Sequence, residues 1–267
     1  ENGATKFWEF WLPATGSLPV SDATGELKID AETAVVLVLL PGGEFTMGSG
    51  PDDPFRNETD GNEVEHQERV AAFYAGKHEI TRGQYRRMMG GPIPAPFKSI
   101  ADYDDGWPMH SINLAAATRC AVIMGGRLPQ EAEWEYACRA GTQSPWWTGE
   151  SQKDAERVAS FGRFGGSGGF VGSDPRRVDS GLPNPFGLVH THGNVVEWCW
   201  DEYSKDYGER TKRTGVILTD IESIKVGVLR GGSAGVPSTF GRSAYRTFAS
   251  PDLANWCTGM RIVIDVE

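Results

Sequence analysis

The sequence predicts a single α+β domain in which short elements are joined by long, irregular loops. Glycine and proline are abundant, with 34 and 16 residues in a chain of 267, which is typical of a protein with many turns. Helical patterning of apolar residues is confined to positions 82–139. The other apolar runs are short, and Gly and Pro interrupt them, which favours strands and turns over a helical bundle.

A chain of this length is sufficient for one large domain. The first 33 residues contain an aromatic cluster between positions 7 and 11, followed by turn-rich sequence. We expect residues 1–33 to form an extension that packs its aromatic side chains onto a main domain of residues 34–267. No internal repeat or low-complexity linker divides that domain.

Strands are predicted in the first part of the main domain. The β-branched, apolar run Val35–Leu40 predicts a buried strand, and Glu44–Met47 is expected to pair with it after a Pro-Gly-Gly turn. Val70–Phe73 and Lys77–Ile80 alternate in the manner of two further strands. The acidic, turn-rich segment Gly48–Glu65 is interpreted as a solvated surface loop and not as a metal site.

Three helices are predicted after these strands. Thr81 has the chemistry of an N-cap before Arg82–Met89, which a Gly-Gly pair ends. Asn113 is expected to cap a second helix across Leu114–Met124, which a further Gly-Gly pair closes. A third helix, Ala132–Arg139, carries an aromatic stripe on one face.

Charge and cysteine content exclude several classes of function. The net charge of −10 argues against nucleic-acid binding, which needs a basic surface, and against binding to anionic membranes. No run approaches the roughly 18 apolar residues of a membrane span, so no membrane insertion is expected. The four cysteines are widely spaced, so neither a disulfide framework nor a zinc site is indicated. Cys120 and Cys138 are expected to be free, buried thiols.

Eight phrases resemble, in order and spacing, the formylglycine-generating-enzyme (sulfatase-modifying-factor) family. They occupy residues 41–49, 78–85, 126–137, 184–188, 193–198, 229–233, 242–246 and 259–261. The resemblance implies a C-type-lectin-like fold of the formylglycine-generating-enzyme type, irregular and loop-rich. Within this scaffold we expect Arg127 to anchor the third helix by charge-assisted bonds to Glu131 or Glu135, while Trp134 and Tyr136 supply core area.

The resemblance also implies a copper site that this sequence lacks. Family members that oxidise cysteine hold copper with two cysteines, because thiolates suit Cu(I). The positions that correspond to this pair are Ser238 and Ser243, and Cys257 has no second thiol near it in sequence. We therefore expect no copper cofactor and no oxidase reaction.

A histidine pair is the best alternative metal site. His190 and His192, two residues apart in a strand, would point the same way and bind a metal with Glu197 or Asp201. The family has a structural calcium site in this segment, and the matching positions are His190, Gly193, Val195 and Glu197. Imidazole departs from the oxygen ligands that calcium prefers. The loop Ser160–Gly172, where a second calcium site would fall, has no Asp or Glu. A histidine pair without metal is the favoured interpretation.

The segment 234–258 has an unusual composition. Framework positions of the family alternate there with other residues, and these interleaved residues include no Lys, Glu, Gln or Met. Each interleaved residue can be encoded by a codon whose first two bases are unrestricted and whose third base is a pyrimidine. Randomisation of the adenines in AAY codons, where Y is a pyrimidine, produces this set of residues. Trp256 is the one residue of the segment that does not belong to the set. The predicted ligand-binding residues are Ala234, Gly235, Val236, Pro237, Ser238, Thr239, Phe240, Gly241, Tyr245, Thr247, Phe248, Ala249, Ser250, Leu253, Ala254, Cys257 and Thr258.

This composition resembles the variable region of diversity-generating-retroelement variable proteins, which have a C-type-lectin-like fold. The resemblance implies a non-catalytic protein that binds a protein or other macromolecular ligand through a diversified surface, with Phe240, Tyr245 and Phe248 as exposed anchors. Two alternatives remain open. One is a pseudoenzyme paralogue of the family, and the other is a metal-dependent oxidase or sulfoxide-synthase type of enzyme with a substituted site.

Overall fold

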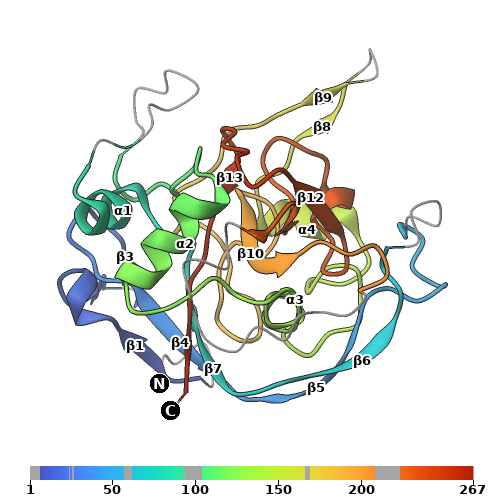
Figure 1. Ribbon diagram of the computed structural model, residues 1–267, viewed down its shortest axis with the longest axis horizontal. Coiled ribbons are helices and arrows are strands. Elements are labelled where there is room, and N and C mark those ends of the chain that lie inside the picture. Colours follow the sequence, from blue (N-terminus) through green and yellow to red (C-terminus); the bar gives the residue numbers. More distant parts are fainter. Residues whose placement is uncertain are drawn as a thin grey trace.

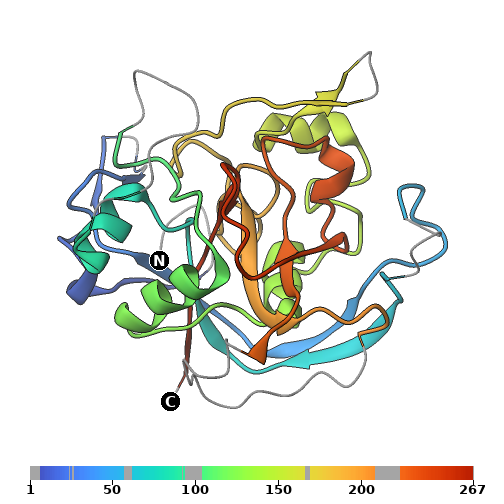
Figure 2. The same cartoon turned by 45° about the horizontal axis from the view of Figure 1, so that its top comes forward.

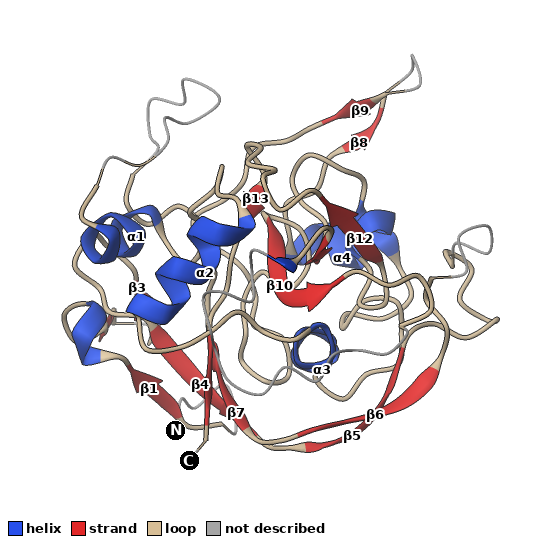
Figure 3. Cartoon of the chain, viewed as in Figure 1, coloured by secondary structure: helices blue, strands red, loops and turns tan. Residues whose placement is uncertain are grey.

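The computed structural model describes residues 7–23, 25, 27–56, 62–91, 93, 104–165, 169–207 and 223–266. Its architecture is α+β, with two four-stranded sheets, short two-stranded hairpins and four α-helices joined by long loops (Figures 1 and 3). The abundance of glycine and proline is therefore matched by a chain that is largely loop. The acidic residues at positions 58–60 lie outside the described residues.

The first sheet joins the two ends of the described chain. Its strands run in the order β1 (Glu9–Trp11), β4 (Val36–Leu40), β7 (Phe73–Gly76) and β14 (Val263–Asp265), and every neighbouring pair is antiparallel. Strand β4 is buried along almost its whole length, as its apolar sequence predicts. The N-terminal segment thus contributes an edge strand to the domain.

The aromatic cluster of the N-terminal segment is only partly packed. The ring centroids of Phe7 and Phe186 are 5.1 Å apart, and those of Phe10 and Tyr74 are 5.4 Å apart. Both pairs of rings pack edge to face. Trp8 and Trp11 remain exposed. The division of the chain at residue 33 stays a prediction.

The second sheet carries the C-terminal part of the chain. Its order is β12 (Arg246–Ala249), β11 (Gly227–Arg230), β10 (Val196–Glu202) and β13 (Thr258–Gly259). The first two pairs are antiparallel, and β10 and β13 are parallel. Strand β12 forms an edge of this sheet, so the segment 231–258 leaves the sheet after β11 and returns to it twice.

Three hairpins extend from the sheets. They are β2 (Val20–Ser21) with β3 (Leu27–Lys28), β5 (Gly43–Met47) with β6 (His66–Val70), and β8 (Arg163–Phe164) with β9 (Phe170–Val171). The predicted strands at 70–73 and 77–80 are wrong in their bounds. β6 and β7 lie on either side of a two-residue link at 71–72, but β6 pairs with β5, whereas β7 pairs with β4 and β14 and ends at Gly76. Alternation of apolar residues therefore located two strands but shifted their bounds. The expected pairing of Glu44–Met47 with Val35–Leu40 is wrong, because β5 pairs with β6 and β4 lies between β1 and β7.

The helices begin and end largely where their capping residues predict. They are α1 (Arg82–Met89), α2 (Leu114–Ile123), α3 (Glu131–Arg139) and α4 (Gln152–Val158). Thr81 and Gln84 form a reciprocal capping box, and the Asn113 side chain accepts a hydrogen bond from Ala116 N at 2.9 Å. Helix α4 contradicts the expectation that no helix follows residue 141. Among the described residues, no helix is long and apolar enough to cross a membrane.

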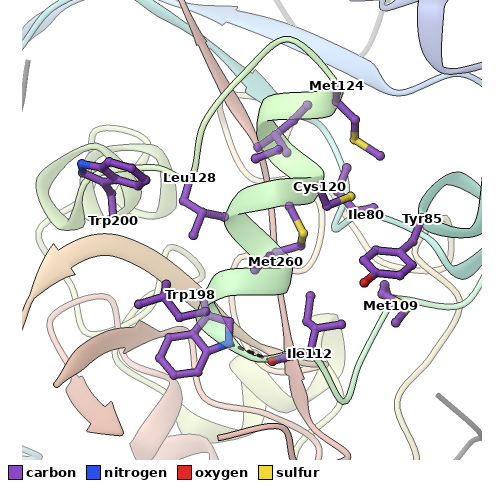
Figure 4. Packing of buried hydrophobic residues seen from close by; sticks show 14 of the residues in the cluster. Ile80, Tyr85, Met109, Ile112, Cys120, Met124, Leu128, Trp198, Trp200 and Met260 are labelled. Atoms are coloured by element: carbon purple, nitrogen blue, oxygen red, sulfur yellow. Dashed lines mark hydrogen bonds between the residues drawn. The ribbon is translucent and has the colours of Figure 1, made fainter. Parts of the chain in front are cut away.

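The main apolar core lies around α2. Cys120 of this helix and its C-cap residue Met124 belong to one buried cluster with Trp198 of β10 and Met260 (Figure 4). The indole of Trp198 donates a hydrogen bond to the Ile112 carbonyl oxygen at 2.9 Å, which satisfies its only polar atom. All four cysteines are free, and those at 120, 138 and 199 are buried.

Helix α3 is the centre of a second kind of core, which is ionic. The helix lies between the β5–β6 hairpin and the second sheet (Figure 1). Glu131 accepts two hydrogen bonds from Arg246, at 2.6 and 2.9 Å, and Glu135 pairs with Arg230 and Arg139. All five side chains are buried. Burial raises the pKa of Glu135, but Arg139 and Arg230 outweigh that effect and hold it below its usual range.

Two further buried arginines anchor the C-terminal segment. Arg242 forms a bidentate pair with Glu63, with both distances 2.8 Å, and contacts Asp53 at 2.9 Å. Arg261 pairs with Glu197 at 2.8 Å. The interpretation of 48–65 as a solvated loop is therefore wrong at Glu63, which is 1% exposed. Its partner lies far away in sequence, and composition alone does not reveal that pairing.

The expected role of Arg127 also needs correction. Its guanidinium pairs with Glu133, at 2.6 and 2.7 Å, and with Asp265. Glu131 and Glu135 instead point to Arg246 and Arg230. Position 133 lies on the opposite face of α3 from 131 and 135, so the helix uses one face to pair with arginines of the second sheet and the other to hold its own N-terminus.

Removing one buried charge from this network should destabilise the fold strongly. The change Glu131→Gln leaves the guanidinium of Arg246 without its ionic partner, so the free energy of unfolding should fall by about 3 kcal/mol or more. Urea denaturation of both proteins gives this difference. The control Asp154→Asn removes an exposed partner of Arg157 and should change stability by less than about 0.5 kcal/mol. A loss below about 1 kcal/mol for Glu131→Gln would show that the network does not hold the fold.

Candidate ligand-binding site

The predicted ligand-binding residues lie along one continuous path on the structure. The path leaves β11, forms a 3-10 helix at Ser238–Gly241, enters β12 and returns through a loop to β13. Around β12, framework residues turn inward and most interleaved residues turn outward. Arg246 is buried, whereas its neighbours Tyr245 and Thr247 are half-buried and Phe248 is 54% exposed.

These outward residues surround an apolar hollow of about 190 Å³. Nine of the seventeen predicted residues line it, namely Val236, Phe240, Tyr245, Thr247, Phe248, Ala249, Leu253, Cys257 and Thr258. Framework residues complete its wall and floor, namely Val196, Leu229, Gly232, Ser233 and Asn255. None of these lining side chains carries a charge, so the hollow suits an uncharged, mainly apolar group.

The rim of the hollow is aromatic on two sides. Phe248 lies over the ring of Tyr203, with ring centroids 4.2 Å apart. On the other side, Phe240 and Tyr245 meet edge to face at 5.2 Å, and both are half-buried. Ser250 and Ala254 are exposed beside the hollow. Of the three expected anchors, Phe248 is thus freely exposed, and the other two form a wall.

Five of the predicted residues are buried beneath this surface. They are Ala234, Pro237, Ser238, Gly241 and Thr258. Gly241 is the most constrained, because a Cβ there would lie 2.3 Å from Phe161 Cε1. A Cβ at Gly235 would approach the ring of Trp256 to 3.0 Å, so the fixed tryptophan limits this position as well. The proposed contact surface is therefore narrower than the seventeen residues.

One aromatic group beside the hollow was missed by the sequence analysis. Phe164 and Phe170 of the β8–β9 hairpin are 65% and 50% exposed, and the ring of Phe170 lies 5.3 Å from that of Phe240. The signal was present, since the two phenylalanines flank a run of glycine and serine at 165–169, a pattern typical of a hairpin. We had interpreted the stretch only as a loop or an irregular strand.

The histidine pair does not form the predicted geometry. His190 has a positive φ of 54° and lies outside the strands, so the two imidazoles are not on one strand face. His190 Nε2 contacts the Arg177 carbonyl oxygen at 3.2 Å. His192 contacts the Gly241 carbonyl oxygen through Nδ1 at 2.8 Å and accepts from Trp147 N through Nε2 at 3.1 Å. The two ring nitrogens of His192 therefore join the loop at Trp147 to the segment around Gly241.

The residues at the implied copper position do not fit that metal. The described chain has no cysteine between Cys199 and Cys257. Ser238 Oγ donates to Glu156 at 2.9 Å, and Ser243 Oγ accepts from the Cys138 thiol at 3.7 Å. Burial raises the pKa of Cys138 to about 12, so this sulfur is a thiol and not the thiolate that Cu(I) prefers.

The implied calcium position is also a poor fit. The Glu197 carboxylate, expected to be a ligand, is occupied by Arg261 and by the indole of Trp134 at 2.8 Å. Among the described residues, no three His, Cys, Asp or Glu side chains gather in a way that could hold a metal ion. The chain therefore fills this position with an ion pair of its own.

Comparison with known proteins agrees with this architecture. The fold is C-type-lectin-like, of the irregular formylglycine-generating-enzyme type. The model of the family described as "Sulfatase-modifying factor enzyme 1-like domain" matches residues 24–266, so the chain belongs to that family. The formylglycine-generating enzyme of Thermomonospora curvata is 26% identical over 88% of this chain and 95% of that protein.

Two solved structures share the fold at low sequence identity. Treponema denticola variable protein 1 matches with a TM-score of 0.67 and 18% identity, over 89% of this chain and 97% of its own. PvdO from Pseudomonas aeruginosa matches with a TM-score of 0.70 and 24% identity, over 94% and 99%. The resemblance seen in the sequence motifs is thereby confirmed for the family and the fold.

A methyl group at Gly241 tests which positions of the segment can vary. Because the new Cβ would collide with Phe161, Gly241→Ala should lower the free energy of unfolding by about 1–3 kcal/mol. The control Ala254→Ser, at an exposed position beside the hollow, should stay within about 0.5 kcal/mol. Equal effects of the two changes, measured by urea denaturation, would contradict this division into framework and surface.

His192 should make stability depend on pH. Burial lowers its pKa to about 3, against roughly 6.5 in an unfolded chain. Below pH ~6.5 the unfolded chain binds a proton that the folded chain does not. The free energy of unfolding therefore decreases as the pH is lowered, by up to about 1.4 kcal/mol per pH unit.

Removing the imidazole by His192→Gln should make this slope shallower between pH 6 and 5. The control Ala254→Ser, at an exposed position without a titratable side chain, should leave the slope unchanged. Urea denaturation at each pH gives both slopes. If His192→Gln keeps the slope of the unaltered protein, His192 does not enter the folded state as a neutral ring.

Proposed function

We propose that this protein is a non-catalytic binding protein that recognises a protein or other macromolecular ligand through the surface around the apolar hollow. The observation that supports this most strongly is the convergence of nine predicted variable residues on one uncharged hollow. Side chains of this kind suit binding, because aromatic and small residues provide contact area at a low cost in conformational entropy.

The proposed function rests on two kinds of residue in the segment 230–261, namely buried residues that hold the backbone and outward residues that face the solvent. Four buried arginines, namely Arg230, Arg242, Arg246 and Arg261, hold the backbone from below. Most outward residues between them lie outside the apolar core, although Ala249 and Leu253 pack against it. Such a surface tolerates exchange of its side chains without loss of the scaffold, which is the property that a diversified binding site requires.

The contact set that we propose is the exposed and half-buried part of the predicted residues without Gly235, where a Cβ would approach the ring of Trp256. It comprises Val236, Thr239, Phe240, Tyr245, Thr247, Phe248, Ala249, Ser250, Leu253, Ala254 and Cys257. Nucleic acid is not proposed as a ligand, because the chain carries a net charge of −10 and the lining residues carry no positive charge.

An enzymatic function is the second candidate, favoured by the 26% identity to the Thermomonospora curvata formylglycine-generating enzyme. Stoichiometric copper or iron in the purified protein, or turnover of a thiol-containing peptide, would support it. The absence of a cysteine pair beside the hollow favours the binding function, since no thiolate pair is present to hold Cu(I).

Exchange of the contact set tests the proposal directly. A displayed library of the chain, with those eleven positions randomised to the residues that AAY diversification produces, should remain largely folded. Selection on an unrelated protein such as lysozyme should then yield specific binders. A control library randomised at the five buried positions should be mostly unfolded.

A contact-set library that folds no better than the buried-position library, or one that yields no binder, would overturn the proposal. The gene itself offers an independent check. A nearby DNA repeat that differs from the coding segment only at adenines would establish the retroelement origin of the surface, and an intact locus without such a repeat would contradict it.

A further inference from the structure

The β8–β9 hairpin presents two exposed phenylalanines that the fold does not explain. Phe164 and Phe170 are opposite each other in the strand register, and their ring centroids are 5.6 Å apart. They are 65% and 50% exposed, and neighbouring Val171 is 44% exposed. Figures 1 and 2 show the hairpin projecting from the body of the molecule on the side of α4 and the 231–245 segment. Exposed apolar clusters of this kind commonly mark interaction sites.

The hairpin is hydrogen-bonded to the predicted variable segment, residues 234–258. At its first strand, Gly162 N donates to the Val236 carbonyl oxygen at 2.8 Å, and beyond its second strand Ser173 N donates to the Ala234 carbonyl oxygen, also at 2.8 Å. Both ends of the hairpin are therefore hydrogen-bonded to residues 234–236. The position of the hairpin is fixed relative to the hollow.

Four aromatic rings connect the hairpin to the hollow. The ring of Phe164 contacts that of Phe170, which lies 5.3 Å from Phe240, and Phe240 lies 5.2 Å from Tyr245. Phe240 and Tyr245 also line the hollow. This aromatic row, Phe164–Phe170–Phe240–Tyr245, makes the hairpin and the hollow one continuous apolar surface.

We propose that Phe164 and Phe170 form a fixed arm of the binding site, which holds an apolar segment of a protein partner while the hollow takes one of its side chains. This inference rests on the proposed binding function and adds a contact that lies outside the predicted variable residues. The arm would supply affinity common to all variants of the surface, and the residues around the hollow would supply specificity.

The geometry of the rings favours a protein over a polysaccharide. Successive rings in the row make angles of 61°, 67° and 81° with one another, so they do not share a plane. Sugars and nucleic-acid bases stack on flat aromatic faces, whereas edge-to-face rings form an uneven surface that fits branched and aromatic side chains. The lack of charge in the hollow likewise suits Leu, Met or Phe in the partner.

The test uses a phage-displayed library of 12-residue peptides selected on the full chain. The peptides recovered should be rich in apolar residues and should bind the Phe164→Ser/Phe170→Ser variant at least about tenfold more weakly than the unaltered protein. The control Leu182→Ser, at a residue that is 61% exposed and outside this surface, should bind within about twofold. Equal melting temperatures of the three proteins would show that the changes act on binding alone.

A third variant separates this inference from the proposed function. Ala249→Phe narrows the hollow, at a residue that lines it. If Ala249→Phe loses the peptides while Phe164→Ser/Phe170→Ser retains them, the arm is wrong and the binding function stands. If both variants retain them, both proposals fail.

Three other results would also overturn the arm as a protein-binding element. A library that yields no apolar peptide would do so. So would binding to an immobilised polysaccharide that depends on Phe164 and Phe170. Self-association of the unaltered chain that the double serine variant abolishes would instead assign the arm to contact between two copies.

Discussion

Four buried arginine–glutamate pairs determine where the C-terminal third of this chain can lie. Two of the pairs join Arg230 and Arg246 to glutamates of α3. Arg242 pairs with Glu63, and Arg261 pairs with Glu197. Each pair is almost fully buried, so each charge depends on its partner. These bonds hold the backbone, so most outward side chains of the same segment are not needed to hold it, whereas Ala249 and Leu253 also pack against the apolar core.

This separation explains how one fold can serve different functions. The chain belongs to a family named for sulfatase modification, and it keeps the motifs that build the scaffold. At the implied copper position it has hydroxyls bonded to Glu156 and to the Cys138 thiol, so the chemistry of a thiolate pair is missing. This part of the surface has an uncharged hollow and an aromatic rim, which support the proposed recognition of a ligand.

The sequence predicted the family, the fold and most helices, because these depend on local signals such as caps and on motif order. It failed where partners are distant in sequence. Glu63 was expected to be solvated, but it is buried against Arg242. His192 was expected to lie on a strand face with His190, but its ring contacts the Gly241 carbonyl oxygen. Helix α4 was missed because seven residues hold too little periodicity. For the site, composition indicated a segment, which stays a prediction, and packing shows that a position in it such as Gly241 is closed to variation.

A saturation mutagenesis scan of residues 230–261, scored by the fraction of folded protein displayed at the cell surface, tests the central claim most directly. The account predicts an alternating profile, in which almost every change at Arg230, Arg242 and Arg246 abolishes folding. Thr247 and Phe248, in the same strand as Arg246, should accept most residues. A uniform profile, or one in which the outward positions are the intolerant ones, would contradict the separation of scaffold and binding surface.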